Sequence, residues 1–108
     1  MKRIVSIQDI SCIGKCSLTV ALPIISAAGI ETAVLPTAVL STHTAFAGGF
    51  TFRDLTDDLV PVSEHWKKEG FKFDAIYTGY LGSFEQLKIV SDFFDDFKDK
   101  NTVIIADP

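Results

Sequence analysis

The sequence predicts an α/β fold, a layered and mostly parallel sheet with flanking helices. Short β-branched runs alternate with helical patterns along the chain, which favours parallel strands joined by right-handed crossovers. The 108 residues are 47% hydrophobic and 22% charged, figures typical of one globular domain with a single core. Residues 1–108 are therefore expected to form a single domain.

The first strand is expected over Arg3–Gln8, a short β-branched run. A turn to Lys15 follows, and then a helical pattern over Ser17–Ala28 that Gly29 closes. Pro23 costs about 3 kcal/mol in a helix interior. The helix therefore either kinks at this proline or begins later.

A second strand is expected over Glu31–Pro36, with an apolar centre. The segment Thr37–Asp54 has no regular pattern and is expected to be a long loop, which is usually functional or ordered as a lid. Thr56–Glu69 is expected to be helical, and Gly70 to end it.

The third strand is expected over Phe73–Thr78, followed by a turn at Gly79–Gly82 and a helix from Ser83. Ser83 and Gln86 form a capping box, in which each side chain satisfies a backbone N–H of the other. An apolar stripe on this helix is expected to cover the sheet. Its members are Leu87, Val90, Phe94 and Phe97.

The fourth strand is expected over Thr102–Ala106, and the chain stops at Asp107-Pro108. With no later strand beside it, this strand is expected to expose an unpaired edge and an uncovered sheet face.

Charge and hydropathy exclude several functions. The net charge is -4 and no cluster of Lys and Arg is present, which excludes a nucleic-acid role. The apolar start is cut at Gln8 and Asp9, too early for a signal peptide. The apolar region Leu18–Leu40 is interrupted by Glu31 and two prolines, so no membrane span is expected. We therefore expect the protein to be cytoplasmic.

Cys12 and Cys16 are expected to be reduced thiols, because the chain has no export signal. Zinc takes four ligands, and only His43 and His65 accompany the cysteines, with no repeated spacing. A zinc site is therefore disfavoured.

Ligands of parallel sheets bind beyond the carboxyl ends of the strands, so the residues after each strand are the candidates. All of these positions carry polar or glycine residues. They are Gln8 and Asp9, then Thr37 with Thr42, His43 and Thr44, then Thr78, Gly79 and Tyr80, and finally Asp107.

Each candidate has an ordinary structural alternative. Asp9 either binds a ligand or stabilises its own turn, and Tyr80 either stacks on a flat ligand or packs. His43 is more simply a loop residue, because it has no carboxylate partner in sequence. Asp107 binds a metal or orders water, or it caps a helix.

Gly14-Lys15-Cys16-Ser17 is not a phosphate-binding loop of the Walker type. The pattern requires a glycine where Asp9 stands and a Ser or Thr directly after the lysine. The N-terminus of the helix expected at Ser17 would still suit an anionic or polar ligand group.

Several segments together resemble the pyridoxal (pyridoxamine) kinase family of the ribokinase-like superfamily, over essentially the whole chain. The most specific are the Gly-Tyr-Leu-Gly-Ser and Ser-x-His-Thr segments. The full set is Ile7-Gln8-Asp9, Val34-Leu35-Pro36-Thr37, Ser41-Thr42-His43-Thr44, Thr78-Gly79-Tyr80-Leu81-Gly82-Ser83 and Ala106-Asp107-Pro108.

The resemblance implies an ATP-dependent kinase that phosphorylates the 5'-hydroxymethyl group of a vitamin B6 vitamer. It implies Mg²⁺, in some members a monovalent cation, and a cytosolic homodimer. Asp9 stands where the family typically has a serine that touches the pyridine ring substituents, and an aspartate suits an amine or a ring N–H instead. Thr44 matches a substrate-side threonine, and Ala45 stands where some members have glutamine. Tyr80 matches an aromatic residue near the substrate, and Asp107 an aspartate on the nucleotide and magnesium side.

In this family the anion hole, the general base and most of the adenine site follow the position of Asp107-Pro108. We therefore expect the chain to be the N-terminal, substrate-side portion of a kinase, to contain no catalytic residue, and to be inactive alone. Two alternatives are a hydroxymethylpyrimidine kinase and a non-catalytic fragment that associates with itself.

Overall fold

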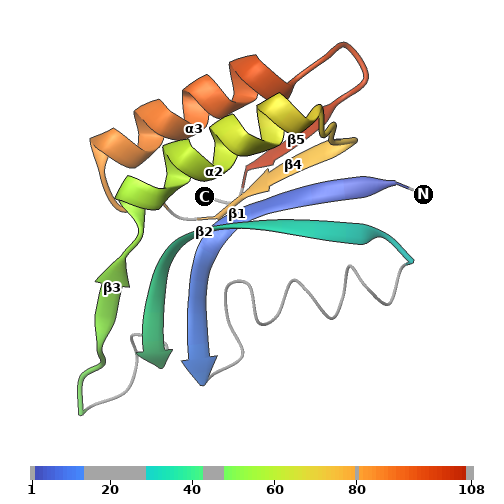
Figure 1. Cartoon of the computed structure of the whole chain (residues 1–108). Helices are drawn as coiled ribbons and strands as arrows, with labels where there is room; N and C mark the ends of the chain where they lie inside the picture. The colour runs from blue at the N-terminus through green and yellow to red at the C-terminus, as the bar shows by residue number, and fades with distance from the viewer. Residues whose placement is uncertain (1, 14–28, 43–47, 80, 107–108) are drawn as a thin grey trace.

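The computed structural model describes residues 2–13, 29–42, 48–79 and 81–106. These form a five-stranded sheet in the order β3-β2-β1-β4-β5, with two helices (Figure 1). All neighbouring strands are parallel except β2 and β3, which are antiparallel. The predicted α/β class is confirmed. The strands are β1 (Arg3–Ile13), β2 (Glu31–Thr42), β3 (Phe52–Asp54), β4 (Ala75–Thr78) and β5 (Val103–Ala106), and the helices are α2 (Thr56–Glu69) and α3 (Phe84–Phe97).

The boundaries of α2 are those that the sequence predicts. Gly70 ends the helix in the left-handed conformation, with a φ of 77°. The α3 helix begins after Ser83, whose side chain accepts a hydrogen bond from the Gln86 backbone N–H. The Gln86 side chain, however, accepts from Gly82 rather than returning to Ser83, so the capping box is only half as predicted.

Two strands extend beyond their predicted ends, and β4 begins at Ala75 rather than at Phe73. The β1 strand continues past Gln8 to Ile13, and β2 continues past Pro36 to Thr42. Pro36 does not end β2 because it lies where the β1–β2 register shifts, and a β-bulge is a place where a strand tolerates proline.

The segment Thr37–Asp54 is therefore not one long irregular loop. Its first residues belong to β2, and its last three form β3, an additional edge strand that pairs with β2. The predicted helix over Ser17–Ala28 lies outside the described residues.

Both helices cover the same face of the sheet (Figure 1). Val5, Ile7, Leu35 and Ile76 point toward them and are buried in the core. The buried face of α3 differs from the prediction at two positions, where Gln86 and Phe93 take the places expected for Leu87 and Phe94. Phe93 is 2% exposed and Leu87 is 49% exposed, because the helix faces the sheet through Gln86, Val90, Phe93 and Phe97, with Phe94 at the margin.

Aromatic rings fill the space between the helices and the sheet. Phe93 and Phe97 stack with centroids 4.4 Å apart, and Phe73 lies 5.4 Å from Phe97. Trp66 on α2 contacts Phe73 with a centroid distance of 5.6 Å. Pairs of this kind contribute roughly 0.5–1.5 kcal/mol beyond their buried area, so this cluster fixes both helices on the sheet.

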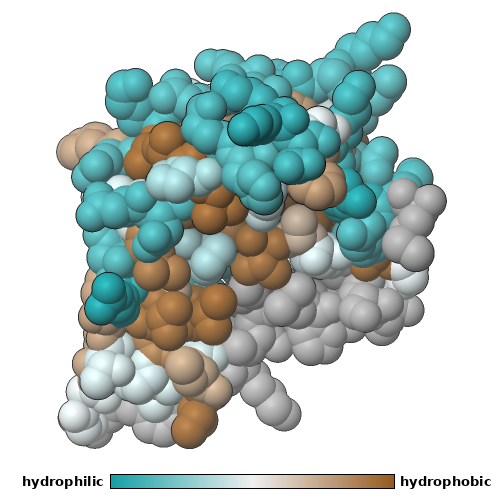
Figure 2. All heavy atoms as spheres, in the orientation of Figure 1, coloured by the Kyte–Doolittle hydropathy of each residue, from teal (hydrophilic) through white to brown (hydrophobic). Residues whose placement is uncertain are grey.

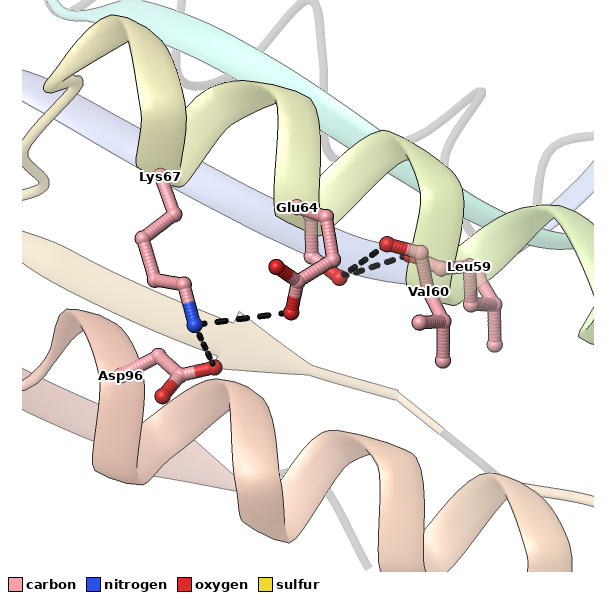
Figure 3. A network of polar contacts seen from close by, with 6 residues as sticks. Leu59, Val60, Glu64, Lys67 and Asp96 are labelled. Carbon is pink, nitrogen blue, oxygen red and sulfur yellow. Dashed lines mark hydrogen bonds and ion pairs between the residues drawn. The ribbon is translucent and has the colours of Figure 1, made fainter.

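Polar contacts join the outer surfaces of the two helices (Figure 3). Lys67 Nζ lies 3.5 Å from Asp96 on α3 and 3.4 Å from Glu64 on its own helix. The two carboxylates, Asp96 first, raise the pKa of Lys67. Exposed ion pairs of this kind add little stability, so the buried rings carry the packing.

Apolar side chains are also exposed at the edges of the sheet. Figure 2 shows hydrophilic residues over the helices and hydrophobic residues lower on the same face, toward β3. Phe50 and Phe52 are exposed there, and Val103 and Ile105 are exposed on β5, which pairs only with β4 among the described strands. Among the described residues, neither helix has the length and apolar character that crossing a bilayer requires.

Candidate substrate-binding site

The strand order places a reversal of direction between β1 and β4. From β1 the chain moves to β2 on one side, and it later enters β4 on the other side. In open α/β sheets a crevice forms at the carboxyl ends of two strands related in this way, and ligands bind there. The candidate site is therefore the carboxyl edge between β1 and β4.

The pairing of β1 with β4 ends at this edge. The β1–β4 pairing stops at Ile7 and Thr78, and one further hydrogen bond runs from Gly79 N–H to the Ile7 carbonyl at 3.0 Å. The β1 strand then continues beside β2 alone, and both bend away from the helices (Figure 1). Gln8 and Asp9 are the first residues of β1 beyond this point.

Asp9 is at the predicted edge, but it is not in a turn. It is a half-buried residue inside β1, at the shift in register where Thr37 and Ala38 of β2 stand opposite it. The alternative that Asp9 only stabilises its own turn is therefore wrong. Gln8 and Thr37, also expected after strand ends, are buried strand residues.

Gly79 allows the chain to pass close to Gln8. A Cβ atom at Gly79 would lie 2.8 Å from Gln8 Cγ and 3.1 Å from Gln8 Cδ. Gln8 is 6% exposed, and its amide donates to Ser6 Oγ at 3.0 Å. Because Gly79 has no side chain, β4 can end against Gln8. From the sequence, Gly79 was expected only as a glycine in a turn.

The Gln86 side chain joins several segments near the same edge. Its Nε2 lies 3.3 Å from the Thr37 carbonyl oxygen and 3.1 Å from Thr56 Oγ1, and its Oε1 accepts from Gly82 N–H at 3.1 Å. Sequence reasoning identified Gln86 only as a helix cap. Its other partners lie 49 and 30 positions away in the chain, a distance that no local pattern reveals.

A carboxylate completes this cluster. Asp54 accepts from Thr56 Oγ1 at 2.6 Å and from Thr56 N–H at 3.0 Å. These bonds, the hydroxyl bond first, lower the pKa of Asp54. Asp54 is therefore a fixed negative charge at the start of α2.

The other predicted site residues lie outside the described residues. They are Thr44, Ala45, Tyr80 and Asp107, together with His43 and Cys16. Thr42 is at the end of β2 and half-buried, and Cys12 is an exposed free cysteine. In the part of the chain that the structure describes, no three His, Cys, Asp or Glu side chains come together as metal ligands.

A separate groove of about 320 Å³ lies between α2 and α3. Its lining includes Val60, Ile89 and Phe93 together with Glu64 and Asp96. It lies in the helical layer and contains none of the predicted site residues.

The chain is similar in sequence and fold to kinases of known structure. A protein from Bacteroides thetaiotaomicron VPI-5482 that carries the name of a phosphomethylpyrimidine kinase, and was crystallised with pyridoxal, is 51% identical to this chain with a TM-score of 0.95. A pyridoxal kinase from Lactobacillus plantarum is 31% identical with a TM-score of 0.88. This chain is therefore similar to part of the pyridoxal and phosphomethylpyrimidine kinases, and its fold is ribokinase-like.

The match covers 99% and 96% of the chain but 37% of each of these two kinases. A pyridoxal kinase from Leishmania donovani in complex with ADP, 19% identical, shows the same fold with a TM-score of 0.85 over 100% of this chain and 39% of its own. No protein-family model and no curated protein matches the chain. The chain thus spans a little more than a third of the length of these kinases.

Proposed function

We propose that this chain supplies the substrate-side part of an ATP-dependent kinase that phosphorylates the 5'-hydroxymethyl group of a vitamin B6 vitamer. The strand order carries the proposal, because it reverses between β1 and β4, and Asp9 lies in β1 just beyond the last β1–β4 pair. The 51% identical protein crystallised with pyridoxal supports a pyridine ligand rather than another small alcohol.

In this proposal the chain holds and orients the vitamer. Asp9 accepts a hydrogen bond from the ring N–H or an amine of the substrate, and Thr44, Ala45 and Tyr80 line the same side. ATP and Mg²⁺, with a monovalent cation as in some family members, bind on the side of Asp107. Transfer of a phosphoryl group depends on positioning and charge stabilisation, so holding the acceptor hydroxyl in line is the contribution of this part.

Coupled ADP release tests the reaction. We expect turnover with pyridoxal, pyridoxine or pyridoxamine by the protein that contains this chain, and absence of turnover with all three at saturating ATP would refute the assignment. Hydroxymethylpyrimidine in the same assay tests the second candidate, which the name of the Bacteroides protein favours. The higher kcat/KM identifies the substrate.

Asp9→Asn tests the role of the carboxylate. A hydrogen bond to a charged group is worth about 1.5–3 kcal/mol, so the KM for the vitamer should rise roughly tenfold to a hundredfold. The KM for ATP should stay within about twofold, because this change removes binding at the acceptor side alone. Asp58→Asn, an exposed carboxylate on α2, is the matched control.

We further propose that the kinase is a cytoplasmic homodimer, and we assign the contact to the exposed apolar residues Phe50 and Phe52. The rival is a non-catalytic fragment that associates with itself through its uncovered edge, where Val103 and Ile105 of β5 are exposed, and through its phenylalanine-rich surface. Sedimentation of Phe52→Ser and Ile105→Lys separates the two. Loss of the dimer in the first variant alone supports the kinase dimer, and loss in the second variant supports the rival.

A further inference from the structure

We propose that Gln86 is a positioning residue for the vitamer. It links Gly82 to Thr37 of β2, and so fixes the distance between the two segments in which candidate substrate residues are expected. This inference rests on the proposed function. Gln86 is a polar residue that is only 6% exposed, and its side chain contacts β2, β3, the start of α2 and the loop before its own helix.

The chemistry of this position requires an amide. The Nε2 group faces three oxygens, at 3.3 Å (Thr37 O), 3.3 Å (Asp54 Oδ1) and 3.1 Å (Thr56 Oγ1). The Oε1 atom faces the Gly82 N–H at 3.1 Å. Only a side chain that donates at one end and accepts at the other satisfies both sides.

The hydrogen bonds of Gln86 Nε2 link separate segments, and they are not needed to give its acceptor oxygens a partner. The Thr37 carbonyl also accepts from Leu55 N–H at 2.9 Å, and Asp54 is held by Thr56 at 2.6 Å. Each partner of Nε2 would therefore keep a bond without Gln86. What would be lost is the connection from the loop to β2.

Both ends of that connection adjoin the candidate site. Thr37 stands opposite Asp9 at the register shift, in the strand that leads to Thr44 and Ala45. Gly82 follows Tyr80 by two residues, and Gly79 is fastened to Ile7 at 3.0 Å. Gly79 is thus held by β1 and Gly82 by Gln86.

Gln86→Met tests the proposal, because it keeps the length of the side chain and removes both polar ends. We expect the KM for pyridoxal to rise about tenfold and the KM for ATP to change less than about twofold, since only the acceptor side is displaced. We also expect the Gly82 amide, measured by hydrogen exchange without any ligand, to exchange at least about tenfold faster.

Gln86→Glu adds a pH profile that a structural role would not give. The new carboxylate would face Asp54, whose pKa is already lowered by Thr56, so the two charges would repel. The vitamer KM of this variant, relative to wild type, should increase as the pH rises from 5 to 8. The relative KM of Gln86→Met should stay constant over the same range.

Val90→Ala is the control, because Val90 is buried on the same helix one turn later and has no part in this network. It should lower stability and leave the vitamer KM unchanged. Equal rises in KM for pyridoxal and ATP, or a KM change in Val90→Ala of the size seen in Gln86→Met, would overturn the positioning role. If the wild-type protein phosphorylates no vitamer, the proposed function fails. Hydrogen exchange at Gly82 then tests the link alone, and an unchanged exchange rate in Gln86→Met would show that Gln86 does not hold Gly82.

Discussion

Replacing Gly79 with alanine tests the packing at the end of β4. The added Cβ would lie 2.8 Å from Gln8 Cγ, 3.1 Å from Cδ and 3.2 Å from Oε1, and carbon atoms in ordinary contact are roughly 3.5–4.0 Å apart. The backbone of Gly79 is outside the left-handed region, so any cost arises from this contact and not from its φ. Alanine must therefore displace the Gln8 side chain.

The size of the effect follows from what Gln8 loses. Overpacking costs about 1–3 kcal/mol, and the Gln8–Ser6 hydrogen bond of 3.0 Å contributes about 1 kcal/mol when it is broken. We expect Gly79→Ala to lower the free energy of unfolding by about 2–3 kcal/mol in urea titrations. The vitamer KM should rise as well, because Gln8 precedes Asp9 at the crevice.

A double-mutant cycle decides whether Gln8 is the cause. In a Gln8→Ala background the Gly79→Ala substitution should cost less than about 0.5 kcal/mol, which is within the error of additivity. The same full cost in both backgrounds would show that the clash with Gln8 is not what Gly79 avoids. Gly29→Ala, a glycine with a φ of 77° and open space around it, is the comparison for a conformational cost.

Two further predictions concern the helical layer and its junction with the sheet. The folded-state pKa of Asp54 is lowered by its bonds to Thr56, so its stabilising contribution is present above the unfolded-state pKa near 4 and is lost as the pH falls through the folded value. The difference in unfolding free energy between wild type and Asp54→Asn should therefore be constant near neutral pH and vanish in acid. A difference that grows in acid would contradict this. Phe93→Ala should lower the free energy of unfolding by about 3–5 kcal/mol, measured by heat or urea, and Leu87→Ala, at a half-exposed position on the same helix, by less than about 1 kcal/mol. Equal losses would favour the predicted buried face, which includes Leu87, over the observed one.

Local signals were sufficient for the fold class and for α2. Gly70 and the apolar spacing define that helix, and the structure ends it at the same residue. The extent of β2 was missed because Pro36 has the local signature of a strand end. Its acceptance depends on the shifted pairing with β1, which is a property of two strands together.

The candidate site was predictable only in part. The alternation of strands and helices predicts that ligands bind at the carboxyl ends of the strands, and Asp9 lies beyond the carboxyl end of the β1–β4 pairing. The role of Gln86 and the closeness of Gly79 to Gln8 arise from segments brought together by folding. Whether Thr44, Ala45, Tyr80 and Asp107 converge on this crevice stays a prediction.

The extra residue in β2 also changes which positions along that strand are shielded from water. Before the bulge the fully shielded apolar position is odd-numbered, at Leu35, and after it the shielded positions are even-numbered, at Ala38 and Leu40. Because side chains alternate sides along a strand, the extra residue at Thr37 and Ala38 keeps these positions on one side of the sheet. Deleting Thr37 would remove the bulge and leave Leu40 on that side, whereas deleting Val39 would turn Leu40 outward. A one-residue deletion in β2 should therefore be tolerated at the bulge and not elsewhere along the strand.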